Sequence, residues 1–444
     1  MEKPIKINDN NWEGLPIDDE QCLENLQKIA SKPIGQLNLD DNPNLLIFPQ
    51  NFDEYGDKIG KEYICEVCEG KLFTKNIMGF IGYGHTKLRI HSRFAHDDDD
   101  YFLHYMLQKV FSINLFDLKY HADEESVFDF LVYLFPVFLK RAIRQGIYKE
   151  YQTHDYNDTN IRGRVDIGKY IRQNIPFTGK IAYSTREYAY DNHVTELIRH
   201  AIEFISNHPY GGGILQNDNM TKDAVSLIRE ATPRYNKNDR RKVINQNLRP
   251  LSHPYFGEYR HLQRLCVQIL RNEEIKYGRN DDEIYGVLFD GAWLWEEYLN
   301  TILKECGFIH PQNKISSGRK YIFEGKKAPC YPDFYQNDIV LDAKYKRYAK
   351  LELSKIDRDD LYQVITYMYI MQANYGGFIV PRQYEFKEHH LDQMKLVGYG
   401  GRMNIYGIIV DAPAETFKEY REIMLQHEKE LMRNLMQYVN GMGT

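Results

Sequence analysis

Apolar residues recur along the chain with two different spacings, and the change of spacing marks out regions. Short apolar runs such as residues 45–49 are separated by glycines near the amino terminus, a pattern typical of short strands joined by turns. Further along, apolar residues repeat every three or four positions, as on helices, most extensively over residues 127–143. We therefore predict a β-rich amino-terminal domain over residues 1–120 and a mainly helical middle region over residues 121–284.

The pattern changes again near residue 285. Helical and strand-like segments then alternate, with helices expected at 293–306 and 360–373, strands at 377–380 and 405–410, and a closing charged helix at 414–439. Alternation of this kind is typical of an α/β domain. We predict a carboxy-terminal α/β domain over residues 285–444, which makes the whole chain a multidomain α+β protein.

Length, charge and cysteine content narrow the class of protein. A chain of 444 residues is too long for one ordinary core, and its net charge of -6 argues against a surface coated with cations for nonspecific nucleic-acid binding. The 6 cysteines follow no disulfide framework, and Cys65 and Cys68 lack a second pair at zinc-site spacing, so ordinary strand residues account for them. The longest apolar stretch is too short to cross a bilayer. We expect a cytoplasmic protein without membrane contact.

Residues 331–344 carry the most informative pattern. If Asn337 and Asp338 form a two-residue turn, the flanking strands pair so that Asp333 lies opposite Asp342. Directly opposed residues have Cβ atoms about 4.5 to 5.5 Å apart, and like charges so placed repel each other. A divalent cation between the acids offsets the repulsion, and oxygen ligands are what Mg²⁺ prefers. Lys344 projects on the same face as Asp342 because side chains alternate along a strand.

These parts suit phosphodiester hydrolysis. The reaction needs a metal that polarises a phosphoryl oxygen and activates water, and a cation that stabilises the transition state. The arrangement resembles the PD-(D/E)xK nuclease superfamily, with Pro332 and Asp333 as its first element and Asp342, Ala343 and Lys344 as its second. The resemblance implies a restriction-endonuclease-like domain, a DNA endonuclease activity, and Mg²⁺ as the cofactor, with Mn²⁺ able to substitute.

Two further segments follow the layout of that superfamily. Upstream, Glu296 flanks the apolar stripe of a predicted helix where the superfamily places an additional metal-proximal glutamate, whereas Glu297 is expected on the solvent side. Downstream, Gln363 and Tyr367 lie four residues apart on one helical face and look like the Q-x-x-x-Y element. Ordinary surface residues remain the alternative for both segments. The expected buried stripe of the upstream helix consists of Leu294, Trp295, Tyr298, Leu299, Ile302, Leu303 and Cys306.

A wider resemblance covers about residues 60–410. Four segments carry it: residues 78–82 (MGFIG), 88–90 (LRI), 161–166 (IRGRVD) and 186–192 (REYAYDN). Together with the carboxy-terminal elements they look like the McrC family of restriction-system subunits.

That likeness implies a nuclease subunit that acts in antiviral defence with a hexamer of McrB-like AAA+ GTPases, which recognises modified cytosine in double-stranded DNA. Residues 1–120 would dock on this ring and stimulate its GTP hydrolysis. The absence of a G-x-x-x-x-G-K-[ST] loop from the sequence fits this division of labour. Arg162 and Arg164 could contact phosphate or hold a β-turn, and we favour the structural interpretation.

Two other functions are compatible with these residues. The first is a repair or CRISPR-associated PD-(D/E)xK nuclease that works alone, which predicts cutting by the purified chain without GTP. The second is a noncatalytic adaptor of a ring NTPase. The presence of Asp333, Asp342 and Lys344 argues against the adaptor, because a degenerate nuclease domain usually loses one of these residues.

Overall fold

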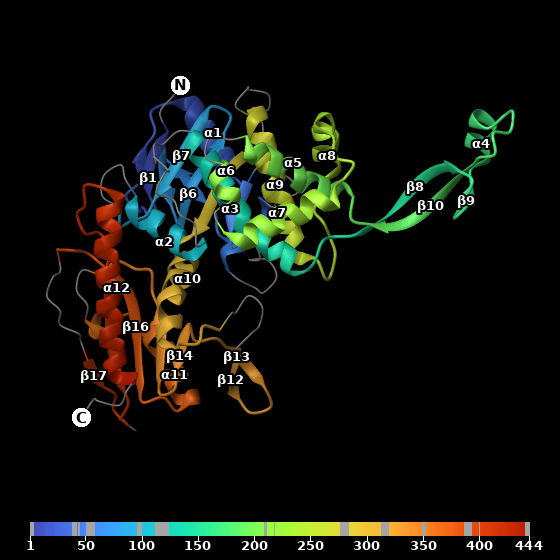
Figure 1. Ribbon diagram of the computed structural model, residues 1–444. Coiled ribbons are helices and arrows are strands. Elements are labelled where there is room, and N and C mark those ends of the chain that lie inside the picture. The colour runs from blue at the N-terminus through green and yellow to red at the C-terminus, as the bar shows by residue number, and fades with distance from the viewer. Residues whose placement is uncertain are drawn as a thin grey trace. The chain divides into compact units, whose positions relative to one another are not determined.

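A computed structural model describes most of the chain. The described residues are 4–37, 42, 45–49, 58–95, 100–111, 124–207, 211–216, 218–275, 284–311, 319–348, 352–385, 393–398 and 400–439. They fall into two compact units, the first made of Met1–Val127 with Asn280–Thr444 and the second of Phe128–Arg279. Both units contain helices and sheet, so the predicted mixed α+β class is confirmed (Figure 1). The division into three domains stays a prediction.

The amino-terminal part of the first unit is built on a five-stranded sheet. Its strands lie in the order β1 (Ile5–Asn8), β7 (Thr86–His91), β6 (Ile77–Tyr83), β11 (Ile284–Asp290) and β3 (Leu45–Phe48). A smaller three-stranded sheet consists of β2 (Leu15–Pro16), β5 (Lys71–Thr74) and β4 (Cys65–Cys68). Helix α1 (Glu20–Ala30) packs on β4 and β6, and buried Leu, Ile and Cys side chains fill the space between. The strands expected in this region are therefore present.

Strand β11 belongs to this amino-terminal sheet although it opens the predicted carboxy-terminal region. It pairs antiparallel with β6 and parallel with β3. Gly79 allows the close pairing, because a Cβ there would lie 2.2 Å from the carbonyl oxygen of Val287. A boundary drawn at residue 285 therefore cuts through a strand of the sheet that precedes it.

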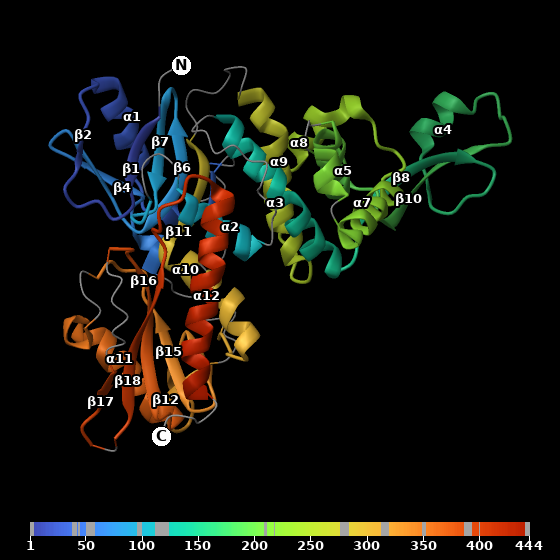
Figure 2. The ribbon, with the colours of Figure 1, turned by 60° about the vertical axis from the view of Figure 1, so that its left-hand side comes forward.

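A second five-stranded sheet forms the carboxy-terminal part of the first unit. Its strands lie in the order β14 (Phe334–Gln336), β15 (Ile339–Ala343), β16 (Tyr375–Arg382), β18 (Arg402–Ile409) and β17 (Gln393–Lys395). Helix α11 (Arg358–Met371) packs on β15 and β16, and α12 (Phe417–Val439) lies along β18 on the other side of the sheet (Figure 2). A short hairpin of β12 (Lys320–Phe323) and β13 (Lys327–Cys330) precedes β14.

Helix α10 (Gly291–Leu303) continues into a 3-10 turn, η4 (Lys304–Cys306), and packs against α2 (Tyr101–Phe111) and β15. All seven residues of its predicted apolar stripe are buried, so that prediction is confirmed. Glu296 and Glu297 are both half-buried, so the predicted difference in exposure between them is not seen. Helices α2 and α12 pack on α10 in addition to strand β15, so more of its surface is covered than on a helix that packs on a sheet alone.

The second unit is mainly helical and also carries a long β-arm. Strands β8 (Glu150–Asp158) and β10 (Ile181–Ala189) pair along their whole length, with the short β9 (Arg164–Val165) added to β10 and α4 (Ile167–Gln173) near the tip. Figure 1 shows the arm extending from the helices of its own unit. Those helices are α3 (Glu124–Arg144), α5 (His193–Ser206), α6 (Gly211–Leu215), α7 (Asn219–Ala231), α8 (Arg240–Gln246) and α9 (Gly257–Ile275).

The segment of Arg162 and Arg164 lies on this arm. Gly163 sits so close to the neighbouring strand that a Cβ would approach the carbonyl oxygen of Ser184 to 2.2 Å. The guanidinium of Arg162 stacks over the ring of Tyr156, with 5.5 Å between the guanidinium carbon and the ring centroid. These contacts support the structural interpretation of the segment.

Two features of the described chain concern membranes and metals. No helix among the described residues is long and apolar enough to span a bilayer. On β4, Cys65 is buried in the core whereas Cys68 is exposed, so the two thiols point to opposite faces of the small sheet.

Candidate active site

The β14–β15 hairpin has the register that the sequence predicts. Phe334 pairs with Leu341, and the ladder continues to Gln336 opposite Ile339, which leaves Asn337 and Asp338 as the turn. Asn337 has a φ of 45°, the left-handed conformation that a tight hairpin turn requires and asparagine tolerates. The next residues outward on the two strands are Asp333 and Asp342.

The two carboxylates meet beyond the end of this ladder. Asp342 is only 1% exposed, and Asp333 reaches across to accept a hydrogen bond of 2.7 Å from the backbone N–H of Ala343. The carboxyl groups of Asp333 and Asp342 lie close enough for each to affect the pKa of the other. The predicted meeting of the two acids is thus present in the structure.

Burial raises the pKa of both acids, and the charge of Asp333 raises that of Asp342 further. Desolvation raises the pKa of Asp333, partly offset by the hydrogen bond from Ala343 and the charge of Lys344. The pKa of Asp342 is raised well above its usual value by burial and then by the negative charge of Asp333. The pair is therefore short of positive charge.

Lys344 supplies the nearest cation. Its Nζ lies 2.9 Å from Oδ2 of Asp342 and 3.1 Å from Oδ1 of Asp360. Burial acts to lower the pKa of Lys344, but the surrounding carboxylates outweigh burial and raise it, so this side chain is an ammonium at neutral pH. Among the described residues, no donor meets Oδ2 of Asp342 in hydrogen-bonding geometry, although the ammonium is close enough for an ion pair.

The Gln363 and Tyr367 pair also reaches this site. The Nε2 of Gln363 donates to the hydroxyl of Tyr367 at 2.8 Å, while Oε1 of Gln363 lies 3.5 Å from Nζ of Lys344. Burial raises the pKa of Tyr367 to about 12, so its hydroxyl remains protonated. The structure thus brings together five of the six predicted site residues: Asp333, Asp342, Lys344, Gln363 and Tyr367.

Asp360 is a site residue that the sequence analysis missed. It lies in the first turn of α11 and binds Lys344 and Lys346, the latter with 2.7 Å between Nζ and Oδ2. These lysines lower the pKa of Asp360 in spite of its partial burial. A signal was available, because Asp360, Gln363 and Tyr367 follow the spacing of one helical face.

Glu296, the sixth predicted residue, is half-buried on α10, which packs on α2, on α12 and on β15, the strand that carries Asp342. Asp342 shares its sheet face with Val340 in the core beneath α11. The predicted role of Glu296 as a metal ligand stays a prediction.

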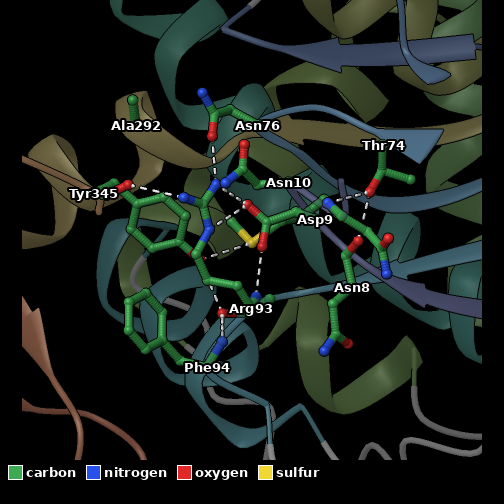
Figure 3. A network of polar contacts seen from close by, with 12 residues as sticks. Asn8, Asp9, Asn10, Thr74, Asn76, Arg93, Phe94, Ala292 and Tyr345 are labelled. Atoms are coloured by element: carbon green, nitrogen blue, oxygen red, sulfur yellow. Dashed lines mark hydrogen bonds and ion pairs between the residues drawn. The ribbon is translucent and has the colours of Figure 1, made fainter. Parts of the chain in front are cut away.

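The residue after Lys344 is anchored in the amino-terminal sheet. Tyr345 is buried, and the guanidinium of Arg93 stacks over its ring with 4.7 Å between the guanidinium carbon and the ring centroid. Arg93 also donates to the carbonyl oxygen of Tyr345 at 3.3 Å and forms a buried ion pair with Asp9 (Figure 3). The Tyr345 hydroxyl lies 2.9 Å from Oγ of Ser92. The chain that follows the site lysine is therefore held from two sides.

Chemically, this arrangement can attract a divalent cation. Two adjacent buried carboxylates with one shared ammonium leave negative charge uncompensated in a medium of low dielectric constant. Within the described part of the chain, no cluster of three or more His, Cys, Asp or Glu side chains is arranged to hold a metal. A cation held by two carboxylates would complete its shell with water or substrate oxygen, which is how Mg²⁺ is usually bound.

Comparisons with known proteins indicate the class of protein to which this chain belongs. A family model described as "McrBC 5-methylcytosine restriction system component" matches residues 72–381. A comparison with curated proteins gives no match. The mixed α+β fold and this match define a restriction-system component. The chain belongs to the McrBC 5-methylcytosine restriction system component family, so the family predicted from the sequence is confirmed.

Two solved structures from Thermococcus gammatolerans are similar to this chain. The first is described as a refined half-complex from a tetradecameric assembly of McrB AAA+ hexamers with bound McrC. It has 15% sequence identity and a TM-score of 0.48, and the match covers 95% of this chain and 99% of that chain. The second, a cryo-EM structure of the McrBC complex, has 14% identity and a TM-score of 0.34, with 68% and 87% covered.

Proposed function

We propose that this chain is the nuclease subunit of an McrBC-type restriction system, a magnesium-dependent PD-(D/E)xK endonuclease that hydrolyses phosphodiester bonds of double-stranded DNA. The observation that carries the proposal is the meeting of Asp333 and Asp342 beside the ammonium of Lys344. Membership of a restriction-system family supports the assignment, because such systems act on DNA.

The residues present fit Mg²⁺. Asp333 and Asp342 would hold the ion, since they offer oxygen ligands, Asp333 places negative charge beside Asp342, and the ammonium at Oδ2 of Asp342 is shared with Asp360. Mn²⁺ would substitute, because it takes the same ligands. We keep Glu296 as a proposed third ligand. When bound, the ion would polarise a phosphoryl oxygen and lower the pKa of an attacking water.

The chain's own residues orient the reacting groups. Lys344 remains charged and adjacent to the acids, so it can stabilise negative charge that develops on the phosphoryl group. Gln363 positions the ammonium, and Tyr367 holds the amide of Gln363 by accepting its hydrogen bond. Asp360 shares the ammonium with Asp342 and so limits its movement.

We also propose that the chain assembles with, and stimulates, an McrB-like AAA+ GTPase hexamer that recognises the DNA. The family description names a component of a system, which implies a partner. The proposal keeps residues 1–120 as a docking surface and adds the tip of the β-arm. None of the α4 residues is buried, and Ile167 and Phe177 are 69% and 67% exposed. Apolar side chains this exposed on a projecting element suit a protein contact.

The cleavage experiment uses the full chain with its partner, GTP, Mg²⁺ and DNA containing 5-methylcytosine. We expect Asp342→Ala to lower the cleavage rate by about a thousandfold or more, because a metal ligand contributes several kcal/mol to the transition state. Asp359→Ala, an exposed acid at the start of α11, is the matched control and should cut normally. Undiminished cutting by Asp342→Ala would refute the assignment.

The same experiment separates the rival functions. Cutting by the isolated chain without GTP would favour a stand-alone repair or CRISPR-associated nuclease. Absence of cutting by the complete wild-type complex, with stable partner binding, would favour a noncatalytic adaptor. Co-purification with a GTP-binding AAA+ protein tests the partner directly, and Ile167→Ser with Phe177→Ser should weaken that complex.

A further inference from the structure

The β12–β13 hairpin is an exposed element that the candidate active site does not use. It projects beside α11 from the carboxy-terminal sheet (Figure 1). Its residues from Ile322 to Pro329 are all exposed, and Phe323 is 64% exposed. An aromatic side chain this exposed at the end of a hairpin contributes little to the fold, so it is available to contact a ligand.

Charge on the hairpin is strongly one-sided. Residues 319–330 carry Arg319, Lys320, Lys326 and Lys327 against a single acid, Glu324, in a chain whose net charge is -6. Neither Lys326 nor Lys327 forms an ion pair with any residue that the structure describes, unlike Lys344 and Lys346. Local cations that outnumber the acids beside them favour a polyanionic ligand.

Strand alternation places the apolar and charged groups together. Phe323 pairs with Lys327 and Tyr321 pairs with Pro329, so these side chains share one face of the hairpin. Cys330 and Lys320 share the other face, which turns toward the core under α11. The outward face therefore presents an aromatic ring next to an ammonium.

The base of the hairpin is fixed close to the acid pair. Arg319 donates to the hydroxyl of Tyr331 at 2.6 Å, and the ammonium of Lys320 lies 4.6 Å from the ring centroid of Tyr335 on β14. Lys327 and Asp333 are six positions apart, and an extended chain spans at most about 3.6 Å per residue, so their Cα atoms lie within about 22 Å of each other. One turn of B-DNA is about 34 Å long, so a duplex at the acid pair is long enough to reach the hairpin.

We infer that the β12–β13 hairpin binds the DNA duplex next to the bond that is cut, with Lys326 and Lys327 on backbone phosphates and Phe323 as an apolar contact in the groove. The inference rests on the proposed function, because it takes its ligand from the neighbouring phosphodiesterase site. Paired cations beside an exposed aromatic residue match the way proteins contact phosphates and insert a side chain at a base step. The hairpin then positions the substrate without taking part in the chemistry.

The test measures binding separately from cleavage. The full chain carrying Asp342→Asn, which should not cut, is titrated with a short fluorescent duplex between about 50 and 200 mM salt. We expect Lys326→Gln with Lys327→Gln to reduce the slope of log affinity against log salt by about 2, since each phosphate contact contributes about 0.9. Phe323→Ala should weaken binding about tenfold and leave the slope unchanged, because a ring contact releases no counterions.

Two control pairs separate local from general effects. Lys418→Gln with Lys429→Gln makes the same charge change on exposed positions of α12, across the sheet from α11, and should leave the slope unchanged. Lys326→Arg with Lys327→Arg keeps the charge and should keep the slope. Unfolding curves of all variants should overlay, because the substituted side chains are exposed.

The outcomes distinguish the two claims. An unchanged salt slope in the Lys326 and Lys327 variant overturns the hairpin inference, and if the wild-type complex still cuts DNA the proposed function stands. Loss of partner binding with normal DNA binding would make the hairpin a protein contact and also overturn the inference. Hairpin-dependent DNA binding by a wild-type complex that never cuts would support the inference and reject the nuclease proposal.

Discussion

Two buried acids in the first unit have opposite charge environments. Asp9 is 1% exposed, and Arg93 meets it with its backbone N–H, Nε and Nη2. Asp342 is equally buried, but it faces Asp333 and shares the ammonium of Lys344 with Asp360. One site balances a carboxylate with a dedicated guanidinium, and the other brings carboxylates together with too little positive charge.

Asp9 and Arg93 form a structural ion pair, whereas Asp342 beside Asp333 forms a site that can bind a further cation. Desolvation raises the pKa of Asp9, and the hydrogen bonds and charge of Arg93 oppose that rise. At Asp342 burial and the neighbouring acid both raise the pKa, and the ammonium of Lys344 only partly opposes that rise. A folded protein tolerates such an excess of negative charge where a bound cation relieves it.

The largest change in stability should come from breaking the ion pair between Asp9 and Arg93. Arg93→Met leaves Asp9 buried without its cation, and we expect a loss of about 3 to 5 kcal/mol in the free energy of unfolding, because one partner of a buried pair is removed. Urea unfolding of the full chain measures it. Arg358→Met, an exposed position at the start of α11, is the control, and a loss at Arg93 no larger than this control would contradict the comparison.

Removing one acid of the Asp333 and Asp342 pair should stabilise the protein, which is the opposite of the effect expected for Arg93→Met. We expect Asp342→Asn to stabilise the metal-free chain by about 1 kcal/mol, since it removes a like-charge repulsion between buried groups while keeping the side-chain volume. The measurement is urea unfolding in the presence of a chelator. A clear destabilisation would indicate that Asp342 is a structural residue like Asp9.

The smallest expected effect is a change with pH in the stability gained by Asp342→Asn. Because the folded pKa of Asp342 is raised above the ordinary 3.8, the folded wild type holds its proton more tightly than the unfolded chain. Wild-type stability therefore rises relative to Asp342→Asn as pH falls from the folded pKa toward 3.8. The advantage of the variant should shrink toward about pH 4 in chelator, and an advantage that grows on acidification would contradict the assigned sign.

Local signals in the sequence were sufficient for the hairpin and the helices of the candidate site. The turn at Asn337 and Asp338 sets the register of two adjacent strands, so the meeting of Asp333 with Asp342 follows from a short segment. The face shared by Gln363 and Tyr367 follows from helix period alone. Asp360 obeys the same period and could have been included.

Contacts between distant segments could not be predicted. The pairing of β11 with β6 joins residues near 285 to residues near 80, and nothing in either segment specifies the other. Tyr345 is likewise held by Arg93, some 250 residues away in the sequence. Alternation predicted which way such side chains point, but the partner depends on how whole sheets pack. The location of Glu296 relative to the acid pair depends on the same packing.

Calorimetric titration of the full chain with Mg²⁺ tests the central claim most directly. The account predicts saturable binding by the wild type and by the Asp359→Asn control, and loss of that binding in Asp342→Asn, whose fold is retained. Binding of Mg²⁺ by Asp342→Asn as tight as that of the wild type would contradict the claim that Asp333 and Asp342 together hold the ion.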